Sequence, residues 1–440
     1  MSNAPPPTVV GAHGPLSPER SKEILAKLAA DSPNSGALER HLALEQAFSE
    51  TPLVAGNDVQ LIADGQKTYD EMFAAIAAAR DHINMETYIL EDDDTGKRFA
   101  DALIAKQRAG VQVNLIRDAV GTIGTPNAFF DRLKEAGIRI VVFNPVNPLE
   151  AKAGWDVNQR DHRKLLVIDG KVAFLGGINI SAVYSGGSFG SRLSMSSGGE
   201  TKKKNPKPAD LLPWKDTDVR IAGPVVAELQ KLFMQTWNDQ HGEPLTDRNY
   251  FPQLQKSGNE VVHAMGSVPA DSFSPIYATL ISAIDNAETE ILITNAYFVP
   301  DPQFTKSLIG AARRGVKVTL ILPSQSDSSL VLNAGRSYYG DLLEGGVQIY
   351  ERKGAILHSK TVLIDGVWST VGSTNLDWRS FLHNQEINAV ILGTEFGDEM
   401  RAAFQNDLAQ SSQITLEAWR SRSIGDRLKQ GFGRLWQYWL

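Results

Sequence analysis

The sequence contains one short motif twice: a histidine, a lysine two positions later and an asparagine 17 positions after the histidine. The residues are His162, Lys164 and Asn179 in the first copy and His358, Lys360 and Asn375 in the second. Side chains two positions apart share one face of a β-strand, so we expect each imidazole to lie beside an ammonium group. A single such pair is usually a surface feature, but two copies in the same register indicate one site built from both.

These side chains suit a displacement at phosphorus. One imidazole can attack the phosphorus atom while the other protonates the departing oxygen, and water or an alcohol can then reverse the two roles. The two lysines would hold the nonbridging oxygens, and the two asparagines would donate neutral hydrogen bonds. Arg160 is predicted to share a strand face with His162 and can assist. The sequence therefore predicts a phosphodiester site that requires no metal ion and no cofactor.

Each histidine also needs a partner on its other ring nitrogen to fix the tautomer, and a carboxylate is the usual choice. Asp216 and Glu386 are the candidates, because each begins the predicted strand that follows one of the two hairpins. The alternative is that each is a solvated carboxylate at the end of a strand.

An Asp-Gly pair follows each motif strand, at Asp169-Gly170 and Asp365-Gly366, and predicts a hairpin turn. We interpret both aspartates as structural, because turn chemistry accounts for them. If each loop has two residues, the register brings two pairs of residues opposite each other: Gly177 with His162, and Ser373 with His358.

The composition is that of an ordinary globular protein, with 440 residues, 42% hydrophobic and 22% charged, and room for about two domains. A net charge of −7 argues against a surface dedicated to nucleic acid, and we expect no nucleic-acid partner. The absence of cysteine excludes disulfides, a thiol nucleophile and cysteine-ligated zinc. The start of the sequence has no signal-like pattern, and no window reaches the roughly 18 apolar residues of a spanning helix. We therefore expect a soluble or peripheral protein.

Predicted helices and strands alternate twice along the chain, which indicates the α/β class. The first half has helices over 69–80 and 96–108 and strands over 82–90, 111–117 and 138–143; the second has helices over 274–286 and 302–314 and strands over 290–297, 316–322 and 347–350. Short phrases recur too, since residues 108–113 resemble residues 313–318. The period of about 200 residues predicts two duplicated domains, each a mixed β-sheet flanked by helices, that meet in a pseudo-twofold pseudo-dimer within one monomer.

We assign the first domain to residues 46–245 and the second to residues 255–414. Residues 1–45 are rich in Pro, Ser and Ala, with a helix near 18–30, and are predicted to be an arm or linker without a catalytic role. The first domain carries an insertion, residues 184–211, that is rich in Ser and Gly and contains Lys202, Lys203, Lys204 and Lys207. We interpret it as a flexible loop or lid; the alternative is a disordered surface insertion without function.

The C-terminal segment, residues 415–440, combines five basic residues with two acidic ones. Its main apolar residues are Trp419, Ile424, Leu428, Phe432, Leu435, Trp436, Trp439 and Leu440. Trp together with Arg is typical of an interfacial helix on anionic lipid, so this tail is predicted to attach the protein to a membrane surface. The alternative, in particular for Trp419, is a helix packed on its own domain with the indole in the core.

The paired motif His-x-Lys-x4-Asp, with the downstream Gly-Gly or Gly-Ser and Asn, resembles the phospholipase D superfamily. Flanking phrases resemble its bacterial cardiolipin synthase branch: WKD at 214–216, NAYFVPD at 295–301 and GSTNLDWRSF at 372–381. The resemblance extends from about Asn57 to the C-terminus and implies two phospholipase D-like domains. Departures from the family pattern are Asp161 in place of Asn, Ala296, and Gly177 at the position of Ser373, the last of which suggests inequivalent halves.

The resemblance implies phosphatidyl transfer through a covalent phosphohistidine, with His162 as nucleophile and His358 as acid and then base. The catalytic residues would be His162, Lys164, Asn179, Asp216, His358, Lys360, Ser373, Asn375 and Glu386, and the substrate contacts Tyr88, Arg160, Tyr297 and Arg379. The expected reaction joins two phosphatidylglycerols into cardiolipin and releases glycerol, on anionic phospholipids at the cytoplasmic face of a bacterial inner membrane. Alternatives are a hydrolytic phospholipase D that makes phosphatidic acid, a phosphodiesterase acting on nucleic acid, and an inactive lipid-binding scaffold.

Overall fold

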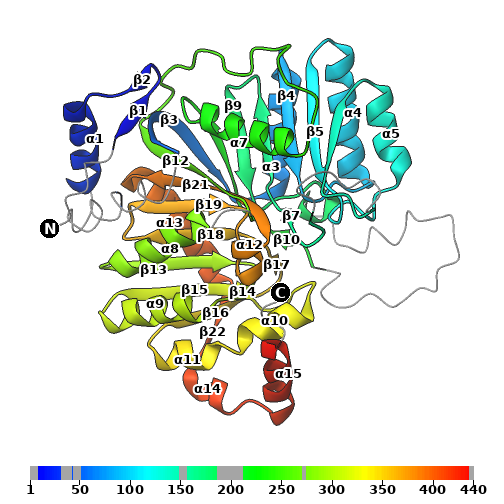
Figure 1. The fold of residues 1–440 in the computed structure, drawn as a ribbon. Helices are drawn as coiled ribbons and strands as arrows, with labels where there is room; N and C mark the ends of the chain where they lie inside the picture. Colours follow the sequence, from blue (N-terminus) through cyan, green and yellow to red (C-terminus); the bar gives the residue numbers. More distant parts are fainter. Residues whose placement is uncertain are drawn as a thin grey trace, which may run out of the picture.

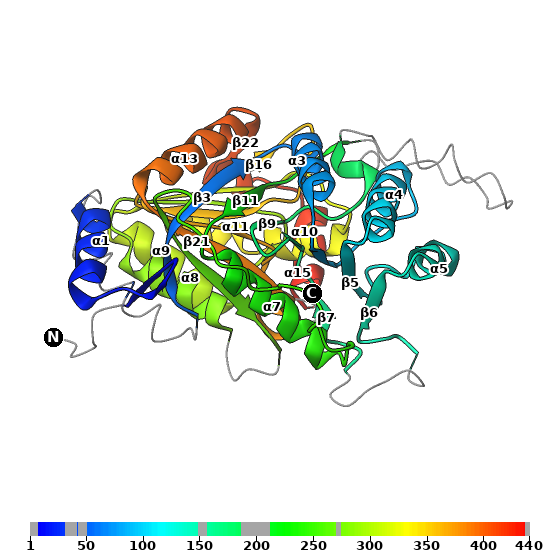
Figure 2. The same cartoon turned by 90° about the horizontal axis from the view of Figure 1, so that it is seen from above.

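The computed structural model describes residues 8–30, 42, 51–147, 156–185, 212–269 and 274–435. These residues form two mixed β-sheets, one mainly from each half of the chain, that are joined into one continuous sheet, together with two short two-stranded sheets. Helices pack against the large sheets (Figures 1 and 2). Figure 1 shows the first half above the second, with the short strands β7, β10 and β17 near the level at which the halves meet.

The first sheet combines a parallel part with an antiparallel part. In pairing order its strands are β6 (Arg139–Phe143), β5 (Gln112–Asp118), β4 (His82–Thr87), β8 (Leu165–Ile168), β9 (Val172–Gly176), β11 (Asp218–Ala222) and β3 (Leu53–Ile62). The pairs β6–β5 and β5–β4 are parallel, and the remaining pairs are antiparallel.

The second sheet repeats this order and then adds an edge strand. Its strands are β22 (Ser411–Ile414), β16 (Gln348–Arg352), β15 (Lys317–Pro323), β13 (Glu290–Asn295), β18 (Lys360–Ile364), β19 (Trp368–Gly372), β21 (Asn384–Leu392) and β12 (Glu260–Ser267). The pairs β16–β15 and β15–β13 are parallel, as in the first half. Because β12 also pairs with β3, the two sheets are continuous at that strand. The predicted α/β class and internal duplication are confirmed.

Six of the ten main helices in the described part of the chain begin after a residue whose side chain caps the first turn. The ten main helices are α3 (Gly65–Ala78), α4 (Asp94–Arg108), α5 (Asn127–Glu135), α7 (Val226–Asp239), α8 (Pro275–Asn286), α9 (Pro302–Arg313), α10 (Ser329–Arg336), α11 (Tyr339–Glu344), α12 (Trp378–Leu382) and α13 (Thr394–Ala409). Asp64, Asp93, Ser274 and Asp301 accept a backbone N–H in the first turn of α3, α4, α8 and α9, which satisfies a donor that the helix leaves unpaired.

The hydrophobic core is divided between the two halves of the chain, with one part shared by both. One cluster lies within the first half and another mainly within the second, while a third includes side chains of both. The third cluster contains Phe233 and Trp237 of α7 together with Met400 and Phe404 of α13. Shared burial of this kind fixes the two halves relative to each other, because separating them would expose apolar surface.

The two Asp-Gly hairpins differ from the predicted register by one position. The ladders pair Ile168 with Val172 and Ile364 with Trp368, so three residues separate the paired positions. The two-residue register, with Gly177 opposite His162 and Ser373 opposite His358, is therefore wrong. Each Asp-Gly pair does form a tight turn with positive φ angles, but the residue after it bulges out of the ladder.

The turn aspartates have the structural role that the sequence predicts. The Asp169 carboxylate accepts N–H bonds from three consecutive residues that lead into β4, at 80–82, and Asp365 accepts three from residues 288–290 that lead into β13. Each hairpin is therefore fixed to the neighbouring strand of its own sheet.

The part of the N-terminal segment that the structure describes is integrated into the fold. β1 (Val9–Gly11) pairs with β3 and with β2 (Gly14–Pro15), and α1 (Pro18–Ala30) buries Leu25. For residues 8–30 the expectation of an arm or linker is therefore wrong, because Val9 and Leu25 belong to the second-half core.

The remaining described elements are the short strands β7 (Arg160–Asp161), β10 (Trp214–Lys215), β14 (Phe298–Val299), β17 (Ile356–Leu357) and β20 (Leu376–Asp377), and the helices η2 (Ala182–Ser185), α14 (Leu416–Arg420) and α15 (Ile424–Leu435).

Two predictions fall largely outside the described residues: the insertion over 186–211 with its lysines, and the tail over 436–440 with Trp436 and Trp439. Within the described tail, Trp419 is in the core, with its ring centroid 4.9 Å from that of Tyr339, so the alternative of packing is correct for this indole. In the part of the chain that the structure describes, every helix is too short or too polar to cross a bilayer.

Candidate active site

Two short strand pairings bring the duplicated motifs to the interface between the halves. β7 runs parallel to the start of β21, and β17 runs parallel to β10. His162 directly follows β7, and His358 directly follows β17. The His162 N–H donates to Gln385 O at 3.0 Å, and the His358 N–H donates to Lys215 O at 2.7 Å. The backbone of each half therefore holds the histidine of the other.

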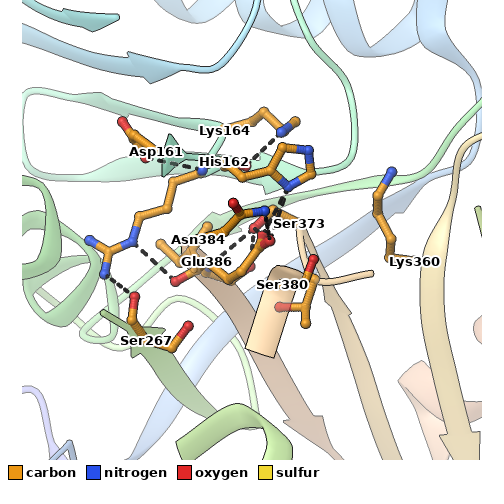
Figure 3. A network of polar contacts seen from close by, with 12 residues as sticks. Asp161, His162, Lys164, Ser267, Lys360, Ser373, Ser380, Asn384 and Glu386 are labelled. Atoms are coloured by element: carbon orange, nitrogen blue, oxygen red, sulfur yellow. Dashed lines mark hydrogen bonds and ion pairs between the residues drawn. The ribbon is translucent and has the colours of Figure 1, made fainter. Parts of the chain in front are cut away.

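The carboxylate that orients each histidine also comes from the opposite half. His162 Nδ1 lies 3.1 Å from both carboxylate oxygens of Glu386, and His358 Nδ1 lies 2.7 Å from Asp216 Oδ2. Figure 3 shows the first of these contacts within its network. The sequence identifies both carboxylates, and the structure adds that the pairs are crossed. With Nδ1–H directed at a carboxylate, Nε2 is the nitrogen left to react.

The predicted residue Ser373 supports Glu386, and its first-half counterpart has no room for a side chain. Ser373 Oγ donates to Glu386 Oε2 at 2.5 Å, and Asn384 Nδ2 donates to Oε1 at 3.2 Å. A Cβ atom on Gly177 would lie 2.2 Å from Asp216 Oδ1, so a serine there would displace this carboxylate. The inequivalence that the sequence suggests thus has a steric cause.

The lysines lie beside the histidines, although the motifs are not single strands. β8 begins at Leu165 and β18 at Lys360, so both histidines precede the strand, contrary to the prediction. Lys164 Nζ donates to His162 O at 2.5 Å, and Lys360 Nζ donates to His358 O. All four side chains are buried. Residues 162–164 and 358–359 lie outside regular strands, and in the second motif Lys360 Nζ lies 2.9 Å from His358 Nδ1.

Burial and the neighbouring charges determine the ionisation of this site. Burial and then the charge of Lys164 lower the pKa of His162 to about 4, and burial and then the charge of Lys360 lower the pKa of His358. Burial lowers the pKa of Lys164 to about 7 and that of Lys360 to about 8. Both imidazoles are therefore neutral near pH 7 before substrate binds, and an anionic phosphate favours the protonated form of all four groups.

Burial alone would raise the pKa of Glu386, but the charge of His162, its hydrogen bond and the charge of Lys164 hold this pKa below its ordinary value. Glu386 is thus an anion that can stabilise an imidazolium on His162.

The two asparagines differ in their surroundings. Asn179 Oδ1 accepts the Ile89 N–H at 3.1 Å, and its Nδ2 donates to the Tyr184 hydroxyl at 3.0 Å, which leaves one amide hydrogen for another acceptor. Asn375 Oδ1 is buried and has no hydrogen-bond partner among the described residues. The pseudo-twofold symmetry is therefore broken at both the Gly/Ser and the Asn positions.

Two of the predicted substrate contacts are tyrosines that flank the histidines. The Tyr88 ring meets the His162 ring edge-on at a centroid distance of 5.0 Å, and Lys164 Nζ lies 5.3 Å from the Tyr88 centroid. The Tyr297 ring centroid lies 6.1 Å from that of His358, and the Tyr297 hydroxyl donates to Asp327 Oδ1 at 2.6 Å. Both tyrosines are half-buried at the sides of the histidine pair.

The two arginines predicted to contact substrate differ in exposure. Arg160 is buried; its Nη2 donates to Asn144 O at 3.0 Å, and its Nη1 lies 3.6 Å from Asp118 Oδ1. Its strand, β7, ends before His162, so the two residues do not share a strand as predicted. Arg379 is half-buried, and its guanidinium reaches across the interface to Asn158 O at 3.1 Å.

Sequence reasoning missed Arg163, the middle residue of the first motif. This buried side chain crosses the interface, where its Nε donates to Glu386 O at 3.0 Å and its Nη2 donates to Ser267 O at 3.1 Å. It therefore fixes the backbone of the residue that orients His162. Strand alternation would predict only that Arg163 faces away from the pair, and its partners are far away in sequence.

The aromatic residues around His358 were also missed. The Trp214 ring centroid lies 5.0 Å from that of His358, and the Tyr184 centroid lies 5.8 Å from it. Their positions at the two ends of the insertion are a signal that the sequence offers, since both must lie where the insertion leaves the domain.

Comparisons with known proteins agree with this geometry. A family described as "Cardiolipin synthase, PLD-like domain" matches residues 72–185 and 280–408. The chain is 32% identical to a cardiolipin synthase of Alkalihalophilus pseudofirmus over 395 residues, which covers 89% of this chain and 74% of the relative. It is 33% identical to the major cardiolipin synthase of Bacillus subtilis over 383 residues, covering 86% and 74%.

Among solved structures, the phosphatidylserine synthase of Haemophilus influenzae superposes with a TM-score of 0.64 at 13% identity, over 91% of this chain and all of that one. At this identity the likeness supports the two-domain fold alone. The extent and identity of the sequence matches establish an enzyme of the phosphatidyltransferase type. The chain belongs to the phospholipase D superfamily, in its cardiolipin synthase branch.

Proposed function

We propose that this enzyme makes cardiolipin from two phosphatidylglycerols through a phosphohistidine and releases glycerol. The observation that carries the proposal is the pair of crossed contacts, His162 with Glu386 and His358 with Asp216, each beside a buried lysine. This arrangement supplies two imidazoles and two cations for one phosphodiester. Relatives named cardiolipin synthase over most of the chain support the choice of lipid.

In the first step, His162 Nε2 attacks the phosphorus of one phosphatidylglycerol, and a P–N bond forms as the P–O bond to glycerol breaks. The bound anionic phosphodiester favours protonation of His358, which gives its Nε2 proton to the departing glycerol oxygen. Lys164 and Lys360 stabilise the charge on the nonbridging oxygens, and the free amide hydrogen of Asn179 can donate to one of them.

In the second step the roles reverse. The neutral His358 Nε2 takes the proton from a hydroxyl of the second phosphatidylglycerol, whose oxygen attacks phosphorus while the P–N bond to His162 breaks. The product is cardiolipin, and His358 is again protonated for the next cycle. Water in place of the second lipid would give phosphatidic acid instead.

The test is to incubate the purified protein with phosphatidylglycerol vesicles and to separate cardiolipin, phosphatidic acid and glycerol. We expect cardiolipin and glycerol in equal amounts, with His162→Ala and His358→Ala each at least about 1,000-fold slower. Acid-labile phosphate should be trapped on the wild type and absent from His162→Ala. Phosphatidic acid as the main product would select the hydrolytic alternative, and no product from wild type would contradict both.

We also propose that the protein binds anionic membranes as a peripheral protein through α15. Ile424, Leu428 and Leu435 are 75%, 70% and 79% exposed along this helix. The opposite face packs tightly on α10, since a Cβ atom on Gly433 would lie 2.6 Å from Ala334 N. The helix therefore presents apolar side chains outward together with exposed basic residues such as Lys429, which suits an anionic interface.

To test membrane binding, Ile424→Ser combined with Leu428→Ser is compared with wild type in sedimentation with phosphatidylglycerol vesicles. We expect at least a tenfold weaker association, because inserting two aliphatic side chains into the membrane contributes roughly 3 kcal/mol or more to the free energy of binding. Turnover of a short-chain soluble substrate should stay unchanged. Ile123→Ser is the matched control, since Ile123 is 71% exposed on the first half. Equal binding of the double variant would contradict the role of α15.

A further inference from the structure

Tyr184 connects the asparagine of the first motif with the histidine of the second. Its hydroxyl accepts a hydrogen bond from Asn179 Nδ2 at 3.0 Å and lies 3.3 Å from His358 Nδ1. The side chain is 3% exposed, so these contacts occur away from bulk solvent. Nδ1 also lies 2.7 Å from Asp216 Oδ2 and 2.9 Å from Lys360 Nζ. Because an ammonium group cannot accept a hydrogen bond, the carboxylate is the nearest acceptor for the Nδ1 hydrogen.

The segment that carries Tyr184 is held rigidly by the first half. The Tyr69 hydroxyl donates to Asn179 O at 2.6 Å, and the Ala182 N–H donates to Asp93 Oδ2 at 2.6 Å. A Cβ atom on Gly65 would lie 2.0 Å from Tyr184 O, so the start of α3 approaches this carbonyl as closely as glycine permits. The phenol oxygen is therefore positioned before substrate binds.

Two aromatic residues lie beside His358, and the equivalent positions near His162 are not aromatic. The Tyr184 and Trp214 rings pack against each other with centroids 5.3 Å apart, and both contact the His358 ring. Counting from the two motifs, the equivalent positions near His162 are Ser380, which is 22 residues after its histidine, and Asn384, which is two before Glu386. The second half therefore has no aromatic residue at either position, and the Tyr184 contact is specific to His358.

We propose that Tyr184 is a positioning residue for His358 in its acid and base steps, with its hydroxyl fixed by Asn179. The phenol oxygen occupies the space beside Nδ1 next to Asp216, so the imidazole cannot rotate away from the carboxylate without meeting it. Nε2 then stays directed at the oxygen that leaves or arrives. This inference rests on the proposed function, in which His358 protonates glycerol and later deprotonates the acceptor.

The test uses two donors that differ in their need for an acid. Glycerol must be protonated as it leaves phosphatidylglycerol, whereas p-nitrophenolate leaves phosphatidyl-p-nitrophenol without a proton. We expect Tyr184→Phe to slow cardiolipin formation from phosphatidylglycerol on the order of tenfold, while the burst of p-nitrophenol keeps the wild-type rate. His358→Ala should show the same pattern more strongly. A loss caused by general damage to the fold would slow both donors.

The matched control is Tyr250→Phe. Tyr250 is also buried, against Asn114 of the first half, and its hydroxyl also accepts a hydrogen bond from an asparagine, Asn114 Nδ2 at 3.3 Å. This variant should turn over both donors like wild type. Thermal unfolding of all variants checks that they are folded at the assay temperature.

The outcomes separate this inference from the proposed function. If His358→Ala keeps the burst and Tyr184→Phe equals wild type with phosphatidylglycerol, the role of Tyr184 is wrong and the mechanism stands. If Tyr184→Phe slows both donors equally, the hydroxyl does not act through the acid step and the inference is also wrong. If His358→Ala loses the burst as well, the assignment of the two histidines fails, whatever Tyr184→Phe does.

Discussion

Lys164 and Lys360 are site residues whose charge states change near neutral pH. Their ammonium groups are buried, which lowers their pKa values to about 7 and about 8. A lysine that is neutral part of the time is a weaker anchor for phosphate, but substrate binding restores its charge at the moment when the charge is needed. The protonation of the two lysines therefore depends on bound substrate as well as on pH.

We expect kcat/KM for a short-chain phosphatidylglycerol to fall at both ends of the pH range. Below about pH 4 His162 becomes protonated and cannot attack, and above about pH 7 to 8 the lysines lose their charge in the free enzyme. Lys164→Arg keeps its charge throughout, so its alkaline limb should move to higher pH even if the maximal rate is lower. The measurement is a pH profile of kcat/KM for both proteins.

Lys171→Arg, on the exposed turn of the same hairpin, is the control and should give the wild-type profile. An alkaline limb at the same pH in Lys164→Arg would mean that another group titrates there.

At the scale of elements, the hairpins and their flanking strands set where the site can form. The sequence predicts the alternation of helices and strands, the Asp-Gly turns and both carboxylates, because these depend on local patterns of spacing and side-chain type. It does not predict that Glu386 serves His162 or that Arg163 binds Glu386 O. Those contacts depend on the pairing of β7 with β21, segments more than 200 residues apart.

The register predicted for the hairpins differs from the observed one by a single position. The two-residue turn at Asp169-Gly170 forms as predicted, but the bulge at Lys171 shifts the ladder by one position. The residue types around Lys171 do not distinguish a two-residue loop from a three-residue loop, and the register becomes visible only in the pairing of β9 with β8 and β11.

Gly177→Ser tests whether the elements of the first half tolerate the residue found in the second. The added Cβ would lie 2.2 Å from Asp216 Oδ1, so we expect the carboxylate to leave His358 Nδ1 and cardiolipin formation to fall on the order of 100-fold. The free energy of unfolding should decrease by only about 1–3 kcal/mol, as for other overpacked sites. Activity assays and denaturant unfolding measure the two effects.

Gly124→Ser is the control, because a Cβ atom there meets no heavy atom within 4 Å. Full activity of Gly177→Ser would show that Asp216 can shift without cost to the reaction.

At the scale of the whole molecule, the crossed contacts make one site out of two domains. Neither half contains a complete pair, because Glu386 of the second half orients His162 and Asp216 of the first half orients His358. Arg163 strengthens this exchange by holding the backbone of Glu386. Separation of the domains would therefore disassemble both pairs at once. The buried apolar cluster that both halves share opposes such a separation.

The crossed contacts between the halves predict which reaction step each carboxylate serves. Glu386→Gln removes the anion that stabilises the imidazolium on His162, so it should slow attack on phosphorus by about 100-fold with any leaving group. Asp216→Asn acts on His358 instead, so it should slow the release of glycerol but leave the burst of p-nitrophenol near the wild-type rate. Rapid-quench measurement of the first turnover with both donors distinguishes these outcomes. The opposite pattern, with the burst lost in Asp216→Asn and kept in Glu386→Gln, would make His358 the nucleophile, because the carboxylate that matters for attack must be the partner of the attacking ring.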